Sequence, residues 1–279
     1  HVNRGQTLVL ALLVMNFLLG FLSLVVSRSE RSSPALRWWA IGCLLYAFGL
    51  LVTQQRYLPT AAVAIIGNIM ISWAPIYSVR AVLAHSRRQL NLQLAWNILA
   101  LTCAVLITNN LFWNSALVNF TAPSVIACVL FVIGARNLLV APPDDAGSAA
   151  RFMAGVMLFA VAVWLLRAAF LFNVLDWAAD RDVADLTVAL FAIAQLVVSV
   201  ALTMALFWIE VRRMEASLTK VAFSDALTGL PNRRATMQRL QEEVARSTRT
   251  GRAVALMVLD LDHFKAVNDS RGHHVGDVV

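Results

Sequence analysis

Long apolar runs dominate the first three quarters of the sequence. A helix needs about 20 predominantly apolar residues to cross the hydrocarbon core of a bilayer. Seven runs approach or exceed this length, at residues 6–27, 37–56, 60–83, 91–109, 116–139, 151–173 and 186–209. We therefore predict seven membrane-spanning helices, with the two chain termini on opposite sides of the membrane.

Two of these runs are weaker than the others. Gly42 and Gly49 interrupt the second, and the fourth carries Asn97 and Thr102. Failure of either to insert would move the C-terminal segment to the other side of the membrane, against the charge distribution described next. We keep seven spans.

Basic residues in the connecting segments predict the orientation. Short cytoplasmic loops carry an excess of Arg and Lys. With the N-terminus outside, the outer segments hold only Arg4, Arg56 and Arg181. The cytoplasmic segments then hold Arg28, Arg31, Arg37, Arg80, Arg87, Arg88, Arg136, Arg151, Arg212, Arg213 and Lys220. This predicts an outside N-terminus and a cytoplasmic C-terminus.

Composition supports a membrane protein whose last part belongs to another class. Of the residues, 59% are hydrophobic and 14% are charged, against roughly 25% charged in soluble domains. The net charge is +7, but the arginines are scattered over short loops, so no nucleic-acid partner is expected. The three cysteines lie in apolar runs without metal-like spacing and are interpreted as packing residues.

Polar side chains inside the predicted spans are candidate functional groups, because they are costly in lipid. They are Asn16, Asn68, Asn97, Arg167 and Gln195. Amides also join helices within bundles. For Arg167 two readings stay open, a long side chain that reaches the outer surface and a group that lines a sensor site.

The segment after the seventh span is charged, with a sparse apolar repeat. Val211, Met214, Leu218 and Val221 recur every three or four residues, as in the seam of a short coiled coil. Residues 210–222 are thus predicted to form a stalk helix that pairs with a second copy. Packing of the same face on the following domain is the alternative.

Residues 225–234 read D-A-L-T-G-L-P-N-R-R. Gly229 and Pro231 are expected to break the stalk helix, and Asn232 to cap a new helix whose apolar face includes Met237 and Leu240. The apolar run 253–259 lies between a polar turn and an aspartate, which predicts a buried central strand.

Acidic residues follow this predicted strand. Asp260 and Asp262 are two residues apart, so their carboxylates would project to one side at the strand's end. Oxygen ligands of this kind suit Mg²⁺ together with phosphate. Lys265 offers a cation for phosphates, while Asn268 and Asp277 offer groups able to read a purine edge.

The motifs D-x-L-T-G-L-x-N-R-R at 225–234 and D-x-D-x-F-K-x-x-N-D-x-x-G-H-x-x-G-D at 260–277 together resemble the N-terminal half of a GGDEF domain. The resemblance implies an α-helical multi-pass bundle followed by a truncated α/β, cyclase-like domain. The predicted divisions are 1–209 for the membrane sensor, 210–222 for the stalk and 223–279 for the cytoplasmic domain.

The resemblance also implies roles for single residues. Asp260 and the carbonyl of Leu261 would bind Mg²⁺, with Mn²⁺ as the alternative ion and Asp262 as a secondary acidic group. Lys265 would stabilise charge on the phosphates. The remaining GTP contacts would come from the backbone of His263 and Phe264 and from Asn268, His273 and Asp277. The residues that would shape the turn are Asp225, Leu227, Thr228, Gly229, Asn232 and Arg233.

The implied activity is synthesis of cyclic di-GMP and two pyrophosphates from two GTP by a homodimer, at a bacterial inner membrane. The expected partners are GTP, a second copy and the bilayer. Because the chain runs from His1 to Val279 without the G-G-[DE]-E-F signature, the resemblance assigns the activity to an intact protein and none to this fragment. Two alternatives are a degenerate receptor for GTP or cyclic di-GMP and a transporter with an accessory domain. Against the transporter, no interrupted helices occur at matching positions in two halves.

Overall fold

The computed structural model describes residues 4–29, 33–55, 57, 59–85, 92–113, 115–143, 145–173, 181–225 and 227–276. Two compact units divide the chain, His1–Arg213 and Met214–Val279. The helices of the first unit are α1 (Arg4–Val26), α2 (Pro34–Thr53), α3 (Thr60–His85), α4 (Leu92–Thr108), the π-helix η1 (Asn109–Trp113), α5 (Ala116–Val140), α6 (Gly147–Asn173) and α7 (Arg181–Phe223), whose last residues belong to the second unit.

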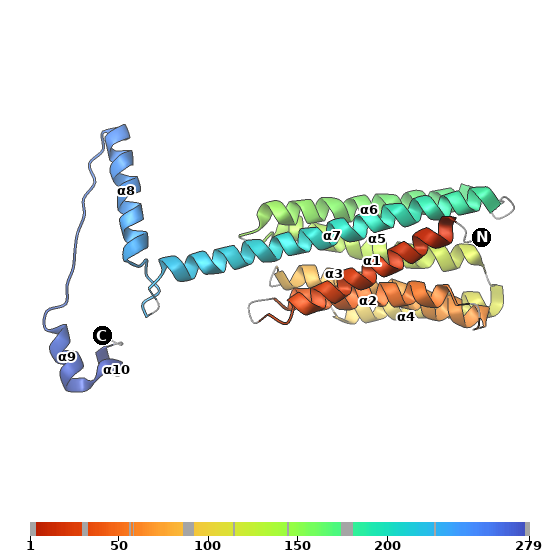
Figure 1. The fold of residues 1–279 in the computed structure, drawn as a ribbon, viewed down its shortest axis with the longest axis horizontal. Coiled ribbons are helices and arrows are strands. Elements are labelled where there is room, and N and C mark those ends of the chain that lie inside the picture. The colour runs from red at the N-terminus through yellow and green to blue at the C-terminus, as the bar shows by residue number, and fades with distance from the viewer. Residues whose placement is uncertain are drawn as a thin grey trace. The chain divides into compact units, whose positions relative to one another are not determined.

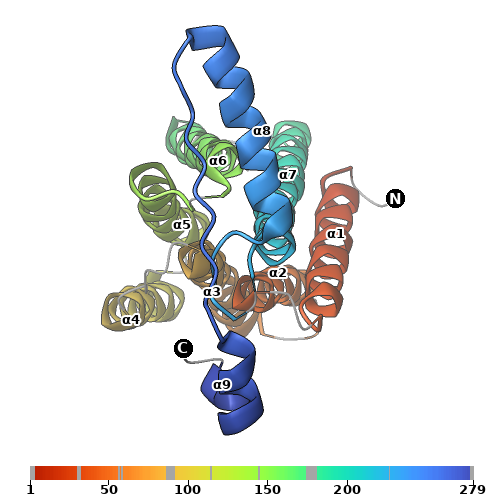
Figure 2. The same ribbon diagram turned by 90° about the vertical axis from the view of Figure 1, so that its left-hand side faces the viewer.

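Within the described ranges, seven helices are long and apolar enough to cross a membrane. They correspond one to one with the seven predicted runs, so the prediction of seven long apolar helices is confirmed. The helices lie side by side (Figure 1), and the view along them shows α3 between α2 and α5 (Figure 2).

Glycines allow α2 and α3 to approach closely. A Cβ atom placed on Gly49 would lie 2.9 Å from the backbone oxygen of Gly67 and 2.8 Å from Ile71 Cγ1. On Gly42 it would lie 3.0 Å from the backbone oxygen of Ala74. The glycines that weaken the second run as a predicted span therefore form its packing surface, as small residues do in membrane bundles.

A buried apolar cluster includes the start of α2 and the end of α3. Leu36, Val82, Met153 and Leu206 are nearly or fully buried there, on α2, α3, α6 and α7. Trp39 is also buried, and its Nε1 donates to Thr203 Oγ1 at 3.1 Å. These contacts fix α7 against the rest of the first unit.

The second unit contains α8 (Arg233–Thr250), α9 (Phe264–Arg271) and α10 (His273–Gly276) as well as the end of α7. The predicted strand at 253–259 is not formed: residues 252–261 form neither helix nor strand. Met257, Val258 and Leu259 are 79%, 83% and 82% exposed. A strand needs a neighbour to receive its hydrogen bonds, and the described residues offer none, so the α/β part of the predicted fold class is not seen here.

Candidate functional site

A compact turn joins α7 to α8, built around one carboxylate. Asp225 Oδ1 accepts from the Thr228 amide and the Thr228 hydroxyl, both at 2.9 Å, and from the Leu227 amide at 3.2 Å. The Asp225 amide donates to the carbonyl of Leu230 at 2.8 Å. The donors from Thr228 and Leu227 stabilise the ionised carboxylate and hold the pKa of Asp225 below its ordinary value.

The same turn requires glycine at one position. Gly229 has φ of 69°, in the left-handed region that residues with a Cβ atom rarely adopt. Its amide donates to the carbonyl of Asp225 at 3.0 Å, and Ser224 and Pro231 form an antiparallel bridge. The pattern D-x-L-T-G thus closes a loop through its own side chain and backbone.

The side-chain amide of Asn232 connects the turn to the next helix through both its oxygen and its nitrogen. Its Oδ1 accepts from the Ala235 amide at 3.1 Å, which caps α8, and its Nδ2 donates to the carbonyl of Ala222 at 2.9 Å. The N-cap prediction for Asn232 is confirmed. Arg233 is the first residue of α8 and is exposed. The predicted apolar face is not covered by the described residues, since Met237 is 50% exposed.

The predicted metal and phosphate residues follow one another along a turn into α9. Asp260, Asp262 and Lys265 are exposed. The carbonyl of Leu261 accepts from the Phe264 amide at 3.4 Å, and His263 precedes α9 with φ of 60°. Two carboxylates, those of Asp260 and Asp262, and the ammonium group of Lys265 thus lie within six consecutive residues at the turn that leads into α9.

These residues do not form a closed site in the described part of the chain. Within it, no three His, Cys, Asp or Glu side chains gather as a set that could hold a metal ion. Asp260 and Asp262 supply oxygen donors of the kind that Mg²⁺ prefers. They fit that ion as part of a ligand set, and other groups must complete its shell.

The predicted purine contacts are placed only in part. Asn268 lies on α9 and is half-buried, and its carbonyl accepts from the Gly272 amide at 2.9 Å. His273 begins α10. Asp277 and the side chain of His273 lie outside the described residues. A shared role for these three side chains therefore stays a prediction.

Most of the polar residues singled out in the membrane part make local contacts. The side-chain amides of Asn16 and Asn68 donate to the carbonyls of Leu12 and Ala64 in their own helices, at 2.9 and 2.8 Å. Asn97 accepts from Gln93 on the same helix at 3.0 Å. These hydrogen bonds of the three side chains thus stay within one helix each, and for Asn16 and Asn68 the partner is a backbone carbonyl one turn earlier.

Gln195 and Arg167 make contacts between α6 and α7. Gln195 Oε1 accepts from Trp164 Nε1 at 3.1 Å. The Arg167 guanidinium lies over the ring of Phe191, 5.9 Å from its centroid. These contacts join the two helices and identify no ligand for Arg167.

Sequence reasoning missed a group of asparagines at the end of α4. Asn119 Oδ1 accepts from Asn109 Nδ2 at 3.1 Å and from Asn110 Nδ2 at 2.8 Å, and Asn119 Nδ2 donates to Asn110 Oδ1 at 3.1 Å. Asn109 and Asn110 begin the π-helix η1, a form that is frequent at functional sites. The pair N-N at the end of a span was the signal available in the sequence.

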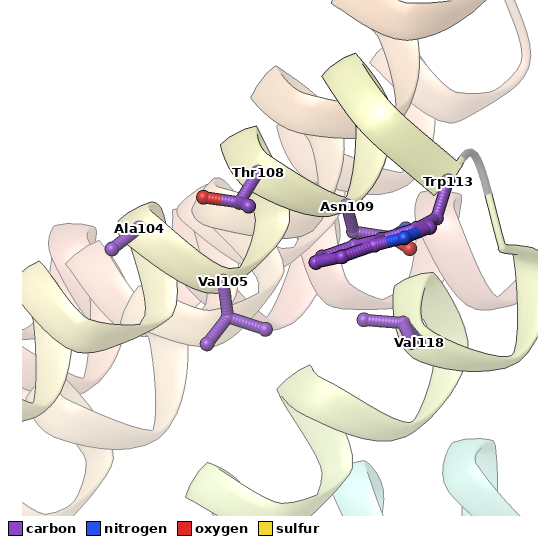
Figure 3. A pocket seen from close by; sticks show the side chains of 6 residues that line it. All are labelled: Ala104, Val105, Thr108, Asn109, Trp113 and Val118. Carbon is purple, nitrogen blue, oxygen red and sulfur yellow. The ribbon is translucent and has the colours of Figure 1, made fainter.

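A pocket of about 350 Å³ opens beside this group (Figure 3). The Trp113 ring lies next to the Asn109 side chain, with Val118 nearby. The lining is mostly apolar and carries no charged side chain. The lining residues are Ala104, Val105, Thr108, Asn109, Trp113 and Val118.

A second missed group is buried between α2, α3 and α7. Glu210 was assigned to the charged stalk, but it is only 4% exposed. Its Oε1 lies 3.0 Å from Nε2 of His85 and accepts from Ser33. A glutamate at the end of one apolar run and a histidine at the end of another were the sequence signals.

Comparison with known proteins concerns the C-terminal segment. Residues 222–279 match the family described as "Diguanylate cyclase, GGDEF domain". No solved structure gives a significant match.

Several relatives found in this comparison carry the name of diguanylate cyclase. Diguanylate cyclase DgcP of Pseudomonas aeruginosa is 57% identical over 58 residues, covering 21% of this chain and 9% of the relative. Diguanylate cyclase DgcS of Shewanella oneidensis is 52% identical over 58 residues, covering 21% and 20%. The bifunctional diguanylate cyclase/cyclic di-GMP phosphodiesterase MucR of Pseudomonas aeruginosa is 43% identical over 67 residues, covering 24% and 10%. The matched part is thus a fifth or less of the length of each.

Proposed function

We propose that this chain is the membrane-anchored, signal-receiving part of a diguanylate cyclase, which makes cyclic di-GMP and two pyrophosphates from two GTP. The observation that carries the proposal is the GGDEF-domain match over residues 222–279, joined directly to seven helices suited to a membrane. The proposed enzyme would lie in a bacterial inner membrane, with the N-terminus outside and the second unit in the cytoplasm.

The proposed site uses the exposed turn before α9. Asp260 and the carbonyl of Leu261 would hold Mg²⁺ or Mn²⁺, with Asp262 beside them, and bound metal would supply Lewis acidity at the phosphates. Lys265 would neutralise phosphate charge, and the backbone of His263 and Phe264 would lie along the phosphates. Asn268, His273 and Asp277 would contact the guanine end of GTP. Catalysis then depends on positioning and on electrostatic stabilisation.

The reaction joins two nucleotides, so the proposed enzyme acts as a homodimer with one GTP on each copy. The stalk supports this reading: α7 is one helix as far as Phe223, and Val211, Met214 and Leu218 on it are 50%, 38% and 52% exposed. An exposed apolar stripe with this spacing suits pairing with the same stripe of a second copy. The remaining α/β part of the cyclase fold would form around residues 253–259.

The test is cyclic di-GMP synthesis by the intact gene product in membrane vesicles, with labelled GTP and Mg²⁺. Asp260→Ala is expected to lower synthesis at least about a hundredfold, because it removes a metal ligand. Glu242→Ala, an exposed carboxylate on α8, is the matched control and should keep wild-type activity. Unchanged synthesis in Asp260→Ala would overturn the metal assignment.

The same assay separates the cyclase from a non-catalytic receptor. If the wild-type protein retains labelled GTP or cyclic di-GMP but forms no product under any condition, the cyclase proposal is wrong and the protein is a non-catalytic receptor.

A further inference from the structure

The buried group formed by Ser33, His85 and Glu210 joins three helices at one end of the bundle. The His85 side chain is 0% exposed and that of Glu210 is 6% exposed. Ser33 caps α2 through its Oγ, which accepts from the Ala35 amide at 3.3 Å. Nothing in the predicted cyclase site uses these residues.

The hydrogen bonds determine how many protons the group holds. His85 Nδ1 lies 3.0 Å from the carbonyl of Ala81, which only accepts, so Nδ1 must carry a hydrogen. His85 Nε2 faces Glu210 Oε1 at 3.0 Å, and the Ser33 hydroxyl donates to the same oxygen. A hydrogen must therefore lie between Nε2 and Oε1, or the ring lone pair would face a carboxylate.

Because Oε1 also accepts from Ser33, we assign this hydrogen to the ring. The complete group is then an imidazolium beside a carboxylate, and it holds one proton more than a neutral histidine beside an ionised glutamate. Removal of that proton leaves two acceptors in contact inside a buried site. Such a contact is unfavourable where water cannot enter.

Charged groups on the surrounding helices are mostly basic, so they oppose the binding of a proton by the group of Ser33, His85 and Glu210. Arg213, one turn beyond Glu210 on α7, acts electrostatically on that carboxylate. Arg80 lies over the Trp38 ring, 3.8 Å from its centroid. The other charged side chains of described residues near this end are exposed: Arg28, Arg37, Arg136, Asp145, Arg151 and Arg212.

We propose that the Ser33–His85–Glu210 group is a proton-binding site that fastens α7 to α2 and α3, and that it loosens when its proton leaves. The proton would come from the side of the membrane on which α7 continues toward Phe223. Any effect of this group on cyclic di-GMP synthesis rests on the proposed function. The proposal of the proton site itself does not depend on that function.

Substitution of Glu210 separates the contact from the proton. In Glu210→Gln the amide nitrogen, in the place of Oε1, can donate both to Nε2 of neutral His85 and to Ser33 Oγ, so the contact persists without the extra proton. In Glu210→Ala both partners are lost. Glu215→Gln, an exposed carboxylate farther along α7, is the matched control.

The experiment is amide hydrogen exchange of residues 205–213 in the full chain in lipid nanodiscs, at about pH 6 and about pH 9, which span the ordinary titration of histidine. Rates are corrected for the intrinsic effect of pH. We expect wild type and Glu215→Gln to exchange about tenfold faster at the higher pH. Glu210→Gln should stay protected at both, and Glu210→Ala should be fast at both.

Nitrogen chemical shifts of labelled histidine give an independent readout, with the His85 signal assigned by its absence in His85→Gln. We expect a doubly protonated ring in the wild type at the lower pH and a neutral ring in Glu210→Gln. A neutral His85 in the wild type at both pH values, or equal pH responses in wild type and Glu210→Gln, would overturn the proposal. Neither readout involves cyclic di-GMP, so failure here leaves the cyclase proposal standing, and failure of the cyclase assay leaves this one.

Discussion

The close contact between α2 and α3 makes a quantitative prediction for Gly49. In Gly49→Ala the new methyl group would lie 2.8 Å from Ile71 Cγ1, 2.9 Å from the backbone oxygen of Gly67 and 3.0 Å from the backbone nitrogen of Ile71. Two of these atoms belong to the backbone of α3, so relief requires the two helices to separate.

The expected cost follows from two opposing effects. Overpacking costs typically 1–3 kcal/mol, while replacing glycine by alanine within a helix returns roughly 0.5–1 kcal/mol. Taking the midpoint of each range, we expect Gly49→Ala to lower the free energy of unfolding by about 1 kcal/mol. That change alters the ratio of folded to unfolded molecules roughly 5-fold.

Gly155→Ala is the matched control because it has the opposite expected sign. Gly155 is also helical, on α6, but a Cβ atom there would meet nothing within 4 Å. Only the conformational term remains, so Gly155→Ala should raise the free energy of unfolding by about 0.5–1 kcal/mol. Both variants are measured by reversible unfolding with sodium dodecyl sulfate in mixed micelles, followed by tryptophan fluorescence. Equal stability of the two variants would refute the packing argument.

Two further predictions concern the turn between α7 and α8. Because the pKa of Asp225 is lowered in the folded turn, its hydrogen bonds should be intact above the ordinary carboxyl value of about 3.9 and should be lost as pH falls through the lowered value. The Thr228 amide shift in an NMR titration reports this, with Asp269→Asn as an unaffected control, and a Thr228 midpoint at the ordinary value would contradict it. Asn232→Ala should destabilise the start of α8 by about 1 kcal/mol, measured as faster exchange of the Ala235 amide, whereas Asn232→Ser retains an acceptor and should lose less. Equal exchange in these two variants would show that the cap contributes little.

The spans were predictable because their signal is local. Length and hydrophobicity decide whether a segment can cross a bilayer, and both can be read without knowledge of neighbouring segments. The cap at Asn232 was predictable for the same reason, since its partner is the Ala235 amide three residues later.

Contacts between distant segments could not be predicted in this way. Glu210 and His85 are 125 residues apart, and no periodicity in the sequence indicates which helices are neighbours. Gly42 and Gly49 illustrate the same limit. From the sequence alone, a glycine that interrupts a hydrophobic run cannot be told from a glycine that forms a helix-packing surface. The strand expected at 253–259 needed a partner strand, and a single apolar run cannot indicate whether one is beside it.

The exposed segment between α8 and α9 has a consequence for handling the protein. Residues 253–259 read A-V-A-L-M-V-L, with no charge and no proline, the composition of segments that stack between chains into cross-β assemblies. Arg252 and Asp260 flank the run with opposite charges, in the positions where gatekeeper residues slow such assembly. In the detergent-solubilised protein, aggregation through the second unit is therefore expected to begin in this segment, and to accelerate when salt screens the two flanking charges.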